Sequence, residues 1–304
     1  MNNIFKNTTF MAIVACWLWS TAFAAVKIGL EYHTPFQFAG IRFFISGLLI
    51  FIFFKNPLEY FNQIRSNLKF ILLVSILNTF VHYAFFYTGI NMVPGALGAM
   101  IIGSSPLFIA IVAHFSFHND KMTKLKTLSI LIGVAGIIII TTGRSAQQFS
   151  GDMEILGIVF LLINNIISGY SNVLVSKSPD NLSPLVLSSA SLIIGGSMLM
   201  LVSLPLEGIP SNGFPLQYYI ALCWLSFLSA TAFSIWFSLL KRSGVKVSLL
   251  NIWKFIIPVS GAILSWIIIE DEKPDYVSVI GMIIIAISLF TLNYANRRYA
   301  KNLK

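Results

Sequence analysis

Charged side chains are scarce in this 304-residue chain, at 10% of the residues, against about 25% in typical soluble domains. Hydrophobic residues make up 57% of the chain, and its mean hydropathy is +0.83. A soluble protein of this composition would expose large apolar patches to water, and a disordered chain would be poorer in apolar residues. The composition therefore excludes both classes and indicates a polytopic membrane protein.

Cysteine is also rare, and the motifs of enzyme chemistry are lacking. The two cysteines, Cys16 and Cys223, lie in apolar runs, which argues against a disulfide framework and is typical of small packing residues. The sequence has no His-Glu-x-x-His motif, no nucleophile elbow, no phosphate-binding loop and no Cys/His metal cluster. We therefore predict that the protein is not an enzyme, holds no cofactor or metal, and does not by itself drive transport with ATP.

Ten apolar stretches are long enough to cross a membrane, which takes roughly 20 mostly apolar residues per helix. They cover about residues 10–30, 36–54, 68–90, 93–115, 126–143, 154–176, 184–205, 217–240, 247–269 and 275–295. The first stretch also resembles a signal peptide ending near Ala24, but its apolar run continues to Leu30, so we interpret it as a span. The predicted fold is an all-α polytopic membrane protein with ten transmembrane helices.

The basic residues predict the orientation of these spans. With the N-terminus in the cytoplasm, 15 of the 20 Lys and Arg residues, from Lys6 to Lys304, fall in inner segments, and only Arg144 and Lys273 fall in outer ones. By the positive-inside rule, both termini are predicted to be cytoplasmic. This spread accounts for the net charge of +9 without a basic patch for nucleic acid.

We expect a multi-pass protein of a bacterial-type cytoplasmic (inner) membrane. Its expected partners are the lipid bilayer and a small-molecule substrate, and we expect a monomer or a homodimer. Nucleic acid is not an expected partner.

The chain divides into two similar halves, predicted at residues 1–146 and 147–304. Pro106 in the fourth span and Pro258 in the ninth lie mid-span, and each is followed by an apolar run and then a short charged turn, at 118–121 and 270–273. Each half has five spans, so the second half must insert upside down relative to the first. Inverted repeats of this kind are common in secondary transporters, which bind substrate near the midplane where the halves meet.

The two mid-span prolines are candidate hinge or cavity residues. A proline inside a helix leaves a backbone carbonyl without its usual donor, and such a break is tolerated at depth where it lines a cavity or is buried in protein. Either proline alone fits a structural kink equally well. The matching positions of Pro106 and Pro258 favour the cavity.

Three basic residues, Lys27, Arg42 and Lys254, lie within spans, whereas no span holds a clearly central Asp or Glu. Charged residues at this depth are costly and usually face a cavity or a partner. We interpret Lys27 as snorkelling toward the outer surface and Arg42 as structural. Because the spans hold basic residues but no central Asp or Glu, they favour a ligand with a carboxylate, phosphate or other anionic group over a cationic drug.

Lys254 is the strongest candidate to bind that anionic group. Asn251, Lys254, Pro258, Gly261 and Ser265 recur at spacings of three and four residues, so they share one face of the ninth span. A polar, small face of this kind is typical of a cavity wall and also of a tight helix contact. Snorkelling of Lys254 toward the inner surface is the alternative.

Polar residues of the third and sixth spans complete the candidate site. Asn78 and His82 share a face of the third span, and Ser168 and Asn172 are one turn apart in the sixth. His82 can titrate near neutral pH and couple protons to transport, although a neutral packing histidine is the more frequent case. Ser168 and Asn172 fit a wet path and interhelical hydrogen bonds equally well.

The sixth span is unusually polar because it also carries Asn164, Asn165 and Ser171. The aromatic residues suited to stacking on a substrate are Trp17, Trp19, Tyr83, Tyr87, Trp236 and Trp253. We interpret most of these aromatic residues as packing or interfacial residues.

A pattern of Trp, small residues, Lys, Pro and Arg-Phe opens the chain, in CWLWSTAFAAVKIGL and TPFQFAGIRFF. Its members are Trp19, Ser20, Phe23, Lys27, Pro35, Arg42 and Phe43. With GALGAMIIGSSPLFIAIVA around Pro106, this pattern resembles the EamA-type members of the drug/metabolite transporter superfamily. Two positions depart from the family's pattern, because Ser20 replaces a glycine and His118 replaces a glutamate, while the acidic turn at Glu270 is kept.

That resemblance implies ten helices, cytoplasmic termini, a central cavity and, in many members, export of amino acids or other metabolites. We therefore predict a secondary transporter that exports small organic metabolites, such as amino acids or related carboxylates, by alternating access. The predicted substrate-binding residues are Lys254, Asn251, His82, Asn78, Ser168 and Asn172, with Pro106 and Pro258 at the hinge or cavity. An uptake carrier for an anion, sugar or nucleoside is one alternative, and a non-transporting membrane scaffold or sensor is another.

Overall fold

The computed structural model describes residues 7–116, 121–143, 152–209 and 213–302, and every regular element within them is a helix. Ten helical segments of this described part are long and apolar enough to cross a membrane, which confirms the predicted fold. They are Thr8–Leu30, Pro35–Ile52, Leu68–Met92, Gly95–Ser116, Lys124–Thr142, Asp152–Ser176, Pro184–Glu207, Leu216–Leu240, Val247–Ile268 and Tyr276–Asn296. Lys6, His118, Arg144, Lys304 and the predicted boundary at 146/147 lie outside the described residues.

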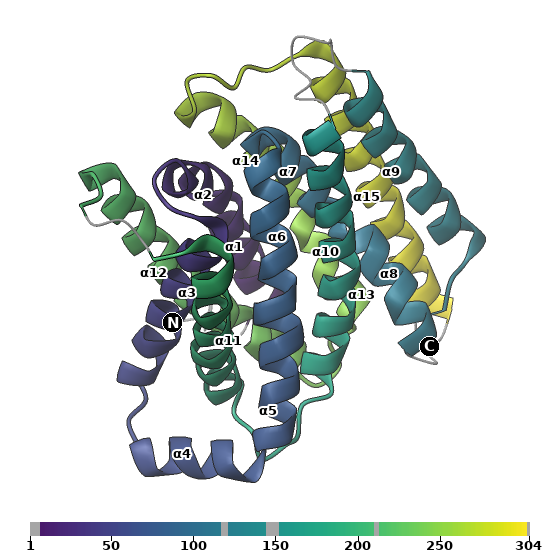
Figure 1. Cartoon of the computed structure of the whole chain (residues 1–304). Coiled ribbons are helices and arrows are strands. Elements are labelled where there is room, and N and C mark those ends of the chain that lie inside the picture. The colour runs from purple at the N-terminus through teal and green to yellow at the C-terminus, as the bar shows by residue number, and fades with distance from the viewer. Residues whose placement is uncertain (1–6, 117–120, 144–151, 210–212, 303–304) are drawn as a thin grey trace.

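Six of the spans are formed by single helices. These are α3 (Pro35–Ile52), α9 (Lys124–Thr142), α10 (Asp152–Ser176), α11 (Pro184–Glu207), α12 (Leu216–Leu240) and α15 (Tyr276–Asn302). A further helix, α4 (Pro57–Ser66), joins the second and third spans and lies across the lower end of the bundle in Figure 1. The Asn56 side chain caps α4 by accepting a hydrogen bond from the backbone N–H of Glu59.

The other four spans are interrupted along their length. The first consists of α1 (Thr8–Ser20) and α2 (Ala22–Leu30), and the fourth of α7 (Gly95–Gly103) and α8 (Ser105–Ser116). The third combines α5 (Leu68–Val74), the π-helical η2 (Ser75–Val81) and α6 (His82–Met92). The ninth combines α13 (Val247–Asn251), the 3-10 helical η3 (Ile252–Phe255) and α14 (Ile256–Ile268).

These interruptions have identifiable local causes. The break in the fourth span directly precedes Pro106, and the 3-10 segment of the ninth ends shortly before Pro258, so the two prolines mark two of the four. In the other two spans, hydroxyl groups bond to the carbonyls of the preceding turn, with Thr21 Oγ1 2.8 Å from the Leu18 oxygen and Ser75 Oγ 2.7 Å from the Ile71 oxygen. Such back-bonding commonly bends helices.

Spans that correspond in the two halves lie against one another. The second span packs on the seventh (α3 on α11), the fourth on the ninth (α7 on α14) and the fifth on the tenth (α9 on α15). The last pair is seen side by side at the right of Figure 1. The third span packs on the sixth, and the first packs on the eighth. Because the first span corresponds to the sixth and the third to the eighth, these two contacts are equivalent in the repeat. This pairing is the one that two inverted five-span repeats produce.

Glycines let the paired helices approach closely. A Cβ atom added to Gly196 on α11 would lie 2.7 Å from the backbone nitrogen of Phe44 and 2.9 Å from the backbone oxygen of Gly40, both on α3. At the pair of α9 and α15, a Cβ atom on Gly281 would lie 3.0 Å from the backbone oxygen of Gly136. Because lipid supplies no hydrophobic drive between helices, this close backbone packing is a main source of association.

Two carboxylates of the second half cap helices of the first half. Glu207, at the end of α11, accepts hydrogen bonds from the backbone N–H groups of Phe36 and Gln37 at the start of α3, at 2.8 and 3.0 Å. Glu272, after α14, accepts from the first two backbone N–H groups of α7, at 2.5 and 2.9 Å. Helix N-termini carry unpaired N–H groups and favour negative charge. Both contacts lie at the end of the bundle opposite the chain termini, because each follows an odd-numbered span.

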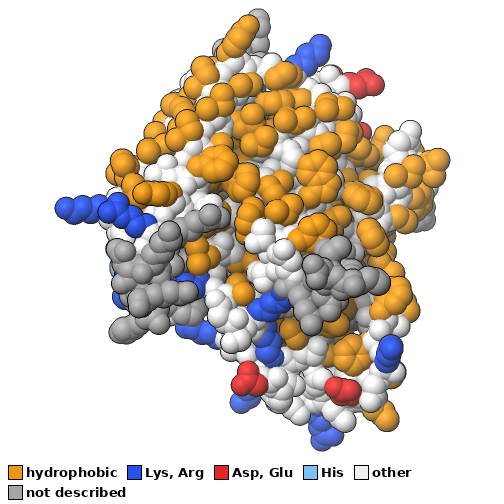
Figure 2. Space-filling view, turned by 180° about the vertical axis from the view of Figure 1, so that it is seen from behind, with side chains coloured by type: hydrophobic (Ala, Val, Ile, Leu, Met, Phe, Trp, Pro, Cys, Tyr) orange, Lys and Arg blue, Asp and Glu red, His pale blue; other side chains and the backbone are white. Residues whose placement is uncertain are grey.

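The surface of the bundle is mostly apolar. Figure 2 shows hydrophobic side chains over most of one face, with Lys, Arg, Asp and Glu gathered toward the edges and one end. Large apolar residues are exposed on this surface, such as Leu201 on α11, 67% exposed, and Leu131 on α9, 62% exposed. An apolar surface of this extent is suited to contact with lipid.

We predict that Gly196→Val destabilises the fold, because the added methyl groups collide with the α3 backbone, where overpacking costs about 1–3 kcal/mol or more. Thermal unfolding of the detergent-purified protein measures the effect. Leu201→Val, on the lipid-facing side of the same helix, is the matched control and should unfold near the wild-type temperature. Equal unfolding temperatures for the two variants would contradict the close contact.

Candidate functional site

A cavity of about 780 Å³, including its open part, lies among seven of the ten spans. Its lining consists of Trp19, Ala22, Phe23, Arg42, Asn78, His82, Tyr83, Phe86, Ile102, Ser105, Asn164, Asn165, Ser168, Asn172, Phe233, Trp236, Phe237, Leu240, Lys254 and Ile257. Aromatic walls with a few convergent polar groups are typical of small-molecule sites.

The interrupted spans supply much of this lining. Trp19 and Phe23 flank the break of the first span, and Asn78 lies in the π-helical segment of the third. Ser105 begins the second half of the fourth span, and Lys254 lies in the 3-10 segment of the ninth. Departures from regular helix within a membrane are tolerated where they line a cavity, so the breaks and the cavity belong together.

The two mid-span prolines stand directly behind the lining. Neither Pro106 nor Pro258 lines the cavity, but their neighbours Ser105 and Ile257 do. A Cβ atom on Gly103 would collide with the Pro258 ring at 2.2 Å, so the two breaks pack on each other. Proline offers no N–H to the carbonyl four residues earlier. These carbonyls belong to Ile102 and Lys254, both in the lining.

The Lys254 ammonium lies inside the cavity without a carboxylate beside it. Its Nζ atom lies 3.4 Å from Ser168 Oγ, 5.7 Å from the Trp19 ring centroid and 5.3 Å from that of Trp236. The side chain is 7% exposed. Aromatic faces attract a cation, but a buried charge is normally paired with an opposite one. Because no Asp or Glu is among the lining residues, the cavity can receive an anionic group at Lys254.

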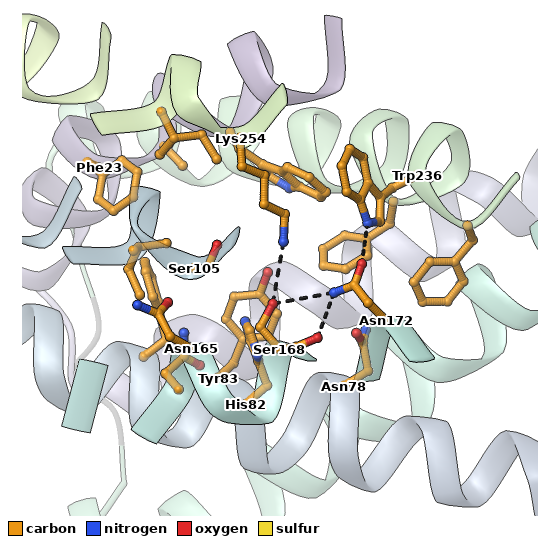
Figure 3. Close-up of a pocket in the computed structure, with 18 of the residues that line it drawn as sticks. Phe23, Asn78, His82, Tyr83, Ser105, Asn165, Ser168, Asn172, Trp236 and Lys254 are labelled. Atoms are coloured by element: carbon orange, nitrogen blue, oxygen red, sulfur yellow. Dashed lines mark hydrogen bonds between the residues drawn. The ribbon is translucent and has the colours of Figure 1, made fainter. Parts of the chain in front are cut away.

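Asn172 holds the wall behind Lys254 in place. Its Oδ1 accepts a hydrogen bond from Trp236 Nε1 at 2.7 Å, and its Nδ2 donates to the backbone oxygen of Ser168 at 2.6 Å (Figure 3). Asn251 Nδ2 lies 3.4 Å from Asn172 Oδ1 and donates to the backbone oxygen of Val247 at 2.9 Å. Asn251 is therefore outside the lining and supports Asn172 from behind, whereas the other five predicted substrate-binding residues line the cavity.

Several buried polar atoms of the lining have no hydrogen-bond partner among the described residues. They are Trp19 Nε1, Asn78 Nδ2, His82 Nδ1, Ser105 Oγ, Asn164 Oδ1 and Asn165 Oδ1. Buried polar groups are nearly always hydrogen-bonded, so such a concentration needs an explanation. Because these unpartnered atoms surround one cavity, they indicate that a polar ligand, or water in the absence of a ligand, supplies their hydrogen bonds.

Arg42 and Lys27 differ from Lys254 because the chain itself satisfies them. The Arg42 guanidinium donates to Ser229 Oγ at 2.8 and 3.0 Å and to Tyr87 Oη at 2.7 Å, although Arg42 also borders the cavity. Lys27 Nζ donates to the backbone oxygens of Val93 at 3.1 Å and Ile90 at 3.4 Å, outside the lining. Of these three basic residues, Lys254 is therefore the one left to a ligand.

The cavity lies at mid-depth, and part of its lining extends toward the end of the bundle that holds the chain termini. Leu240 is the last residue of the eighth span, Asn172 lies one turn from the end of the sixth, and Lys254 lies two turns after the start of the ninth. In a chain of ten spans, all three of these positions are near the side of the termini. The Glu207 and Glu272 contacts lie at the opposite end.

Sequence reasoning missed the aromatic part of the site. Trp19, Tyr83 and Trp236, interpreted as packing or interfacial residues, line the cavity, as do Phe86 and Phe233. Their spacing does not distinguish a cavity wall from a helix contact. Ser105 was also missed, although its place directly before the mid-span Pro106 is a signal that could have identified it.

An inverted repeat around a polar cavity at mid-depth defines the class of protein, a membrane transporter. The family model described as "EamA-like transporter family" matches residues 7–142 and 155–294, and the chain belongs to this family. Within the described residues the two matched segments coincide with the two sets of five spans.

The relatives of the chain carry transporter names. It is similar to the uncharacterized transporter YoaV of Bacillus subtilis (strain 168), 22% identical over 92% of this chain and 95% of that protein. It is also similar to the uncharacterized inner membrane transporter YedA of Escherichia coli (strain K12), 25% identical over 93% and 90% of the two chains. A solved crystal structure of 18% identity shares the fold, with a TM-score of 0.68 over 96% of this chain and 98% of that one.

We predict that Asn172→Ala lowers the thermal stability, because it leaves the buried Trp236 N–H without an acceptor. Hydrogen bonds between membrane helices contribute about 0.6–2 kcal/mol, so the expected loss is of this order. Thermal unfolding in detergent measures it. Ser171→Ala, which removes a buried hydroxyl without a hydrogen-bond partner on the same helix, is the control and should leave the stability unchanged. An unaffected Asn172→Ala variant would contradict the supporting role.

Proposed function

We propose that this protein is a secondary transporter that exports a small carboxylate-bearing metabolite, such as an amino acid or a related acid, from the cytoplasm. The observation that carries the proposal is the Lys254 ammonium, which lies in the cavity beside two aromatic rings and a hydroxyl but no carboxylate. A buried charge is stabilised best by an opposite charge with good hydrogen bonds. A substrate carboxylate supplies both.

The same balance of charge argues against cationic drugs as the main substrates. A cation entering the cavity would meet Lys254 and would find no Asp or Glu in the lining. Repulsion between two buried like charges raises the cost of entry. The cytoplasmic orientation of the termini rests on the 15 inner Lys and Arg residues counted above. With that orientation, the part of the lining at Leu240, Asn172 and Lys254 extends toward the cytoplasm, where an exported metabolite enters.

The proposed mechanism is alternating access, in which the two halves rock around the cavity. The Glu207 and Glu272 contacts join the halves at the end opposite the termini, so they support a state closed on that side. Release of the substrate on that side requires both contacts to separate. The breaks at Pro106 and Pro258, which pack on each other through Gly103, are the proposed hinges.

We predict that carboxylates stabilise the purified wild-type protein, because a ligand that binds only the folded state raises stability by about 2.7 kcal/mol at 100 times its Kd. Thermal unfolding is measured with amino acids, organic acids, sugars, nucleosides and cationic drugs. Lys254→Met, which keeps the apolar stem and removes the charge, should lose the response to carboxylates. Lys55→Met, at an exposed surface lysine, is the control. Stabilisation by cationic drugs, or an unchanged response in Lys254→Met, would refute the proposed role of Lys254.

Direction is tested separately, because helices do not reveal it. The stabilising ligand is loaded on one side of vesicles with known protein orientation, and its flux is followed in both directions. Release toward the side opposite the termini supports export, whereas net accumulation on the side of the termini would establish the uptake carrier instead.

We predict that Glu272→Gln opens the cavity more often on the side opposite the termini, because the loss of one charge-assisted contact removes about 1.5–3 kcal/mol from the closed state. This corresponds to a rise of about tenfold or more in the open population. An impermeant thiol reagent, applied from that side to a Ser105→Cys protein lacking Cys16 and Cys223, measures the access.

Glu270→Gln is the matched control for this measurement, since Glu270 is an exposed carboxylate of the same turn. It should leave the labelling rate unchanged. Equal rates in the two variants would show that the Glu272 contact does not hold the closed state.

A further inference from the structure

A second polar region of the cavity, formed by acceptor atoms, lies beside the break of the fourth span. Asn165 belongs to α10 and is fully buried. Its Nδ2 donates to the backbone oxygen of Ile101 at 2.7 Å and lies 3.4 Å from Ser104 Oγ. Because this contact fixes which end of the amide is nitrogen, the unpartnered atom is the oxygen, Oδ1.

Ser105 is left without a partner by the same arrangement. Helical serines in this chain commonly donate to the carbonyl four residues earlier, as Ser46 does to Arg42 at 2.7 Å. For Ser105 that carbonyl belongs to Ile101, and it is already occupied by Asn165 Nδ2, by Ser104 Oγ at 2.6 Å and by the Ser104 N–H at 3.1 Å. The Ser105 hydroxyl, 2% exposed, therefore remains free for a ligand in the cavity.

A further acceptor belongs to the same lining. Asn164, next to Asn165 on α10 and 1% exposed, also has an unpartnered Oδ1. Figure 3 shows Asn165 and Ser105 on one side of Lys254, with Asn172 and Trp236 on the other. The cavity thus places a cationic donor, Lys254, apart from a group of neutral acceptors.

Neutral amide, hydroxyl and carbonyl oxygens bind N–H donors without requiring a carboxylate. We propose that Asn165, Asn164 and Ser105 form an amino-group subsite, which makes the transporter select a carboxylate that carries an amino group over the same carboxylate without one. This inference rests on the proposed function, because it takes Lys254 as the site of the carboxylate. It adds the residues that decide between substrates sharing that carboxylate.

The test compares matched ligand pairs with the purified full-length protein. Leucine, phenylalanine and serine are each compared with the 2-oxo acid and the 2-hydroxy acid of the same side chain, and Kd is measured by isothermal titration calorimetry. Wild-type protein should bind the amino acid about tenfold or more tightly than the 2-oxo acid, as expected for an additional hydrogen bond to a charged group.

Ser105→Ala should reduce that preference severalfold while leaving the Kd for the 2-oxo acid unchanged. The variant loses no hydrogen bond within the protein, so its fold should be intact. Asn164→Ala provides a second variant with the same expected loss. Ser171→Ala, which removes an unpartnered hydroxyl outside the cavity lining, is the matched control and should keep the wild-type preference.

The possible outcomes separate this inference from the proposed function. Equal binding of amino and 2-oxo acids by the wild-type protein, with both lost in Lys254→Met, would overturn the amino-group subsite and keep the carboxylate site. A hydroxy acid that binds as tightly as the amino acid would also overturn it, because the subsite would then recognise any donor. Binding that is indifferent to Lys254→Met, or absent for all three classes, would overturn the proposed function and the subsite with it.

Discussion

The constraint on which this structure depends is that backbone hydrogen-bonding groups cannot be left unpaired in lipid. Six spans satisfy this constraint as continuous helices, and the helices of the other four are interrupted along their length. Those interruptions are tolerated because they face one another across a protected cavity and because side chains supply hydrogen-bond partners there. The clearest repair is at Ile101, whose carbonyl receives the side-chain amide of Asn165 from another span. The broken backbone and the polar lining are thus parts of one arrangement.

The pairing of equivalent spans gives this arrangement its stability. Glycines at Gly40, Gly196, Gly136 and Gly281 bring the backbones of paired helices together at the periphery. The central pair, α7 and α14, meets instead at Gly103 and the Pro258 ring, directly behind the cavity. Each of these pairs joins one half to the other, so the peripheral pairs hold the halves together tightly, whereas the central pair is irregular beside the cavity. The carboxylate contacts of Glu207 and Glu272 add a polar closure at the end opposite the termini.

Much of the fold could be predicted from the sequence, and a part of the candidate site. The ten spans follow from hydropathy, because a helix must present about 20 apolar residues to cross lipid. The helical spacing of Asn78 and His82, and of Ser168 and Asn172, places each pair on one face, and all four line the cavity. The spacing of Asn251 with Lys254 is just as good, yet Asn251 lies behind the wall. Spacing along one helix identifies a face but not what lies opposite it.

The sequence by itself determined the membrane class, the number of spans, the two-fold repeat and the in-span lysines, because each depends on composition or on order along the chain. Only the tertiary structure decided which lysine is left to a ligand. Arg42 is satisfied by Ser229 and Tyr87, and Lys27 by carbonyls near Val93, whereas Lys254 meets aromatic rings and a single hydroxyl. Those partners come from other spans, distant in the sequence, so the pairing of charge and partner is a property of the packed bundle.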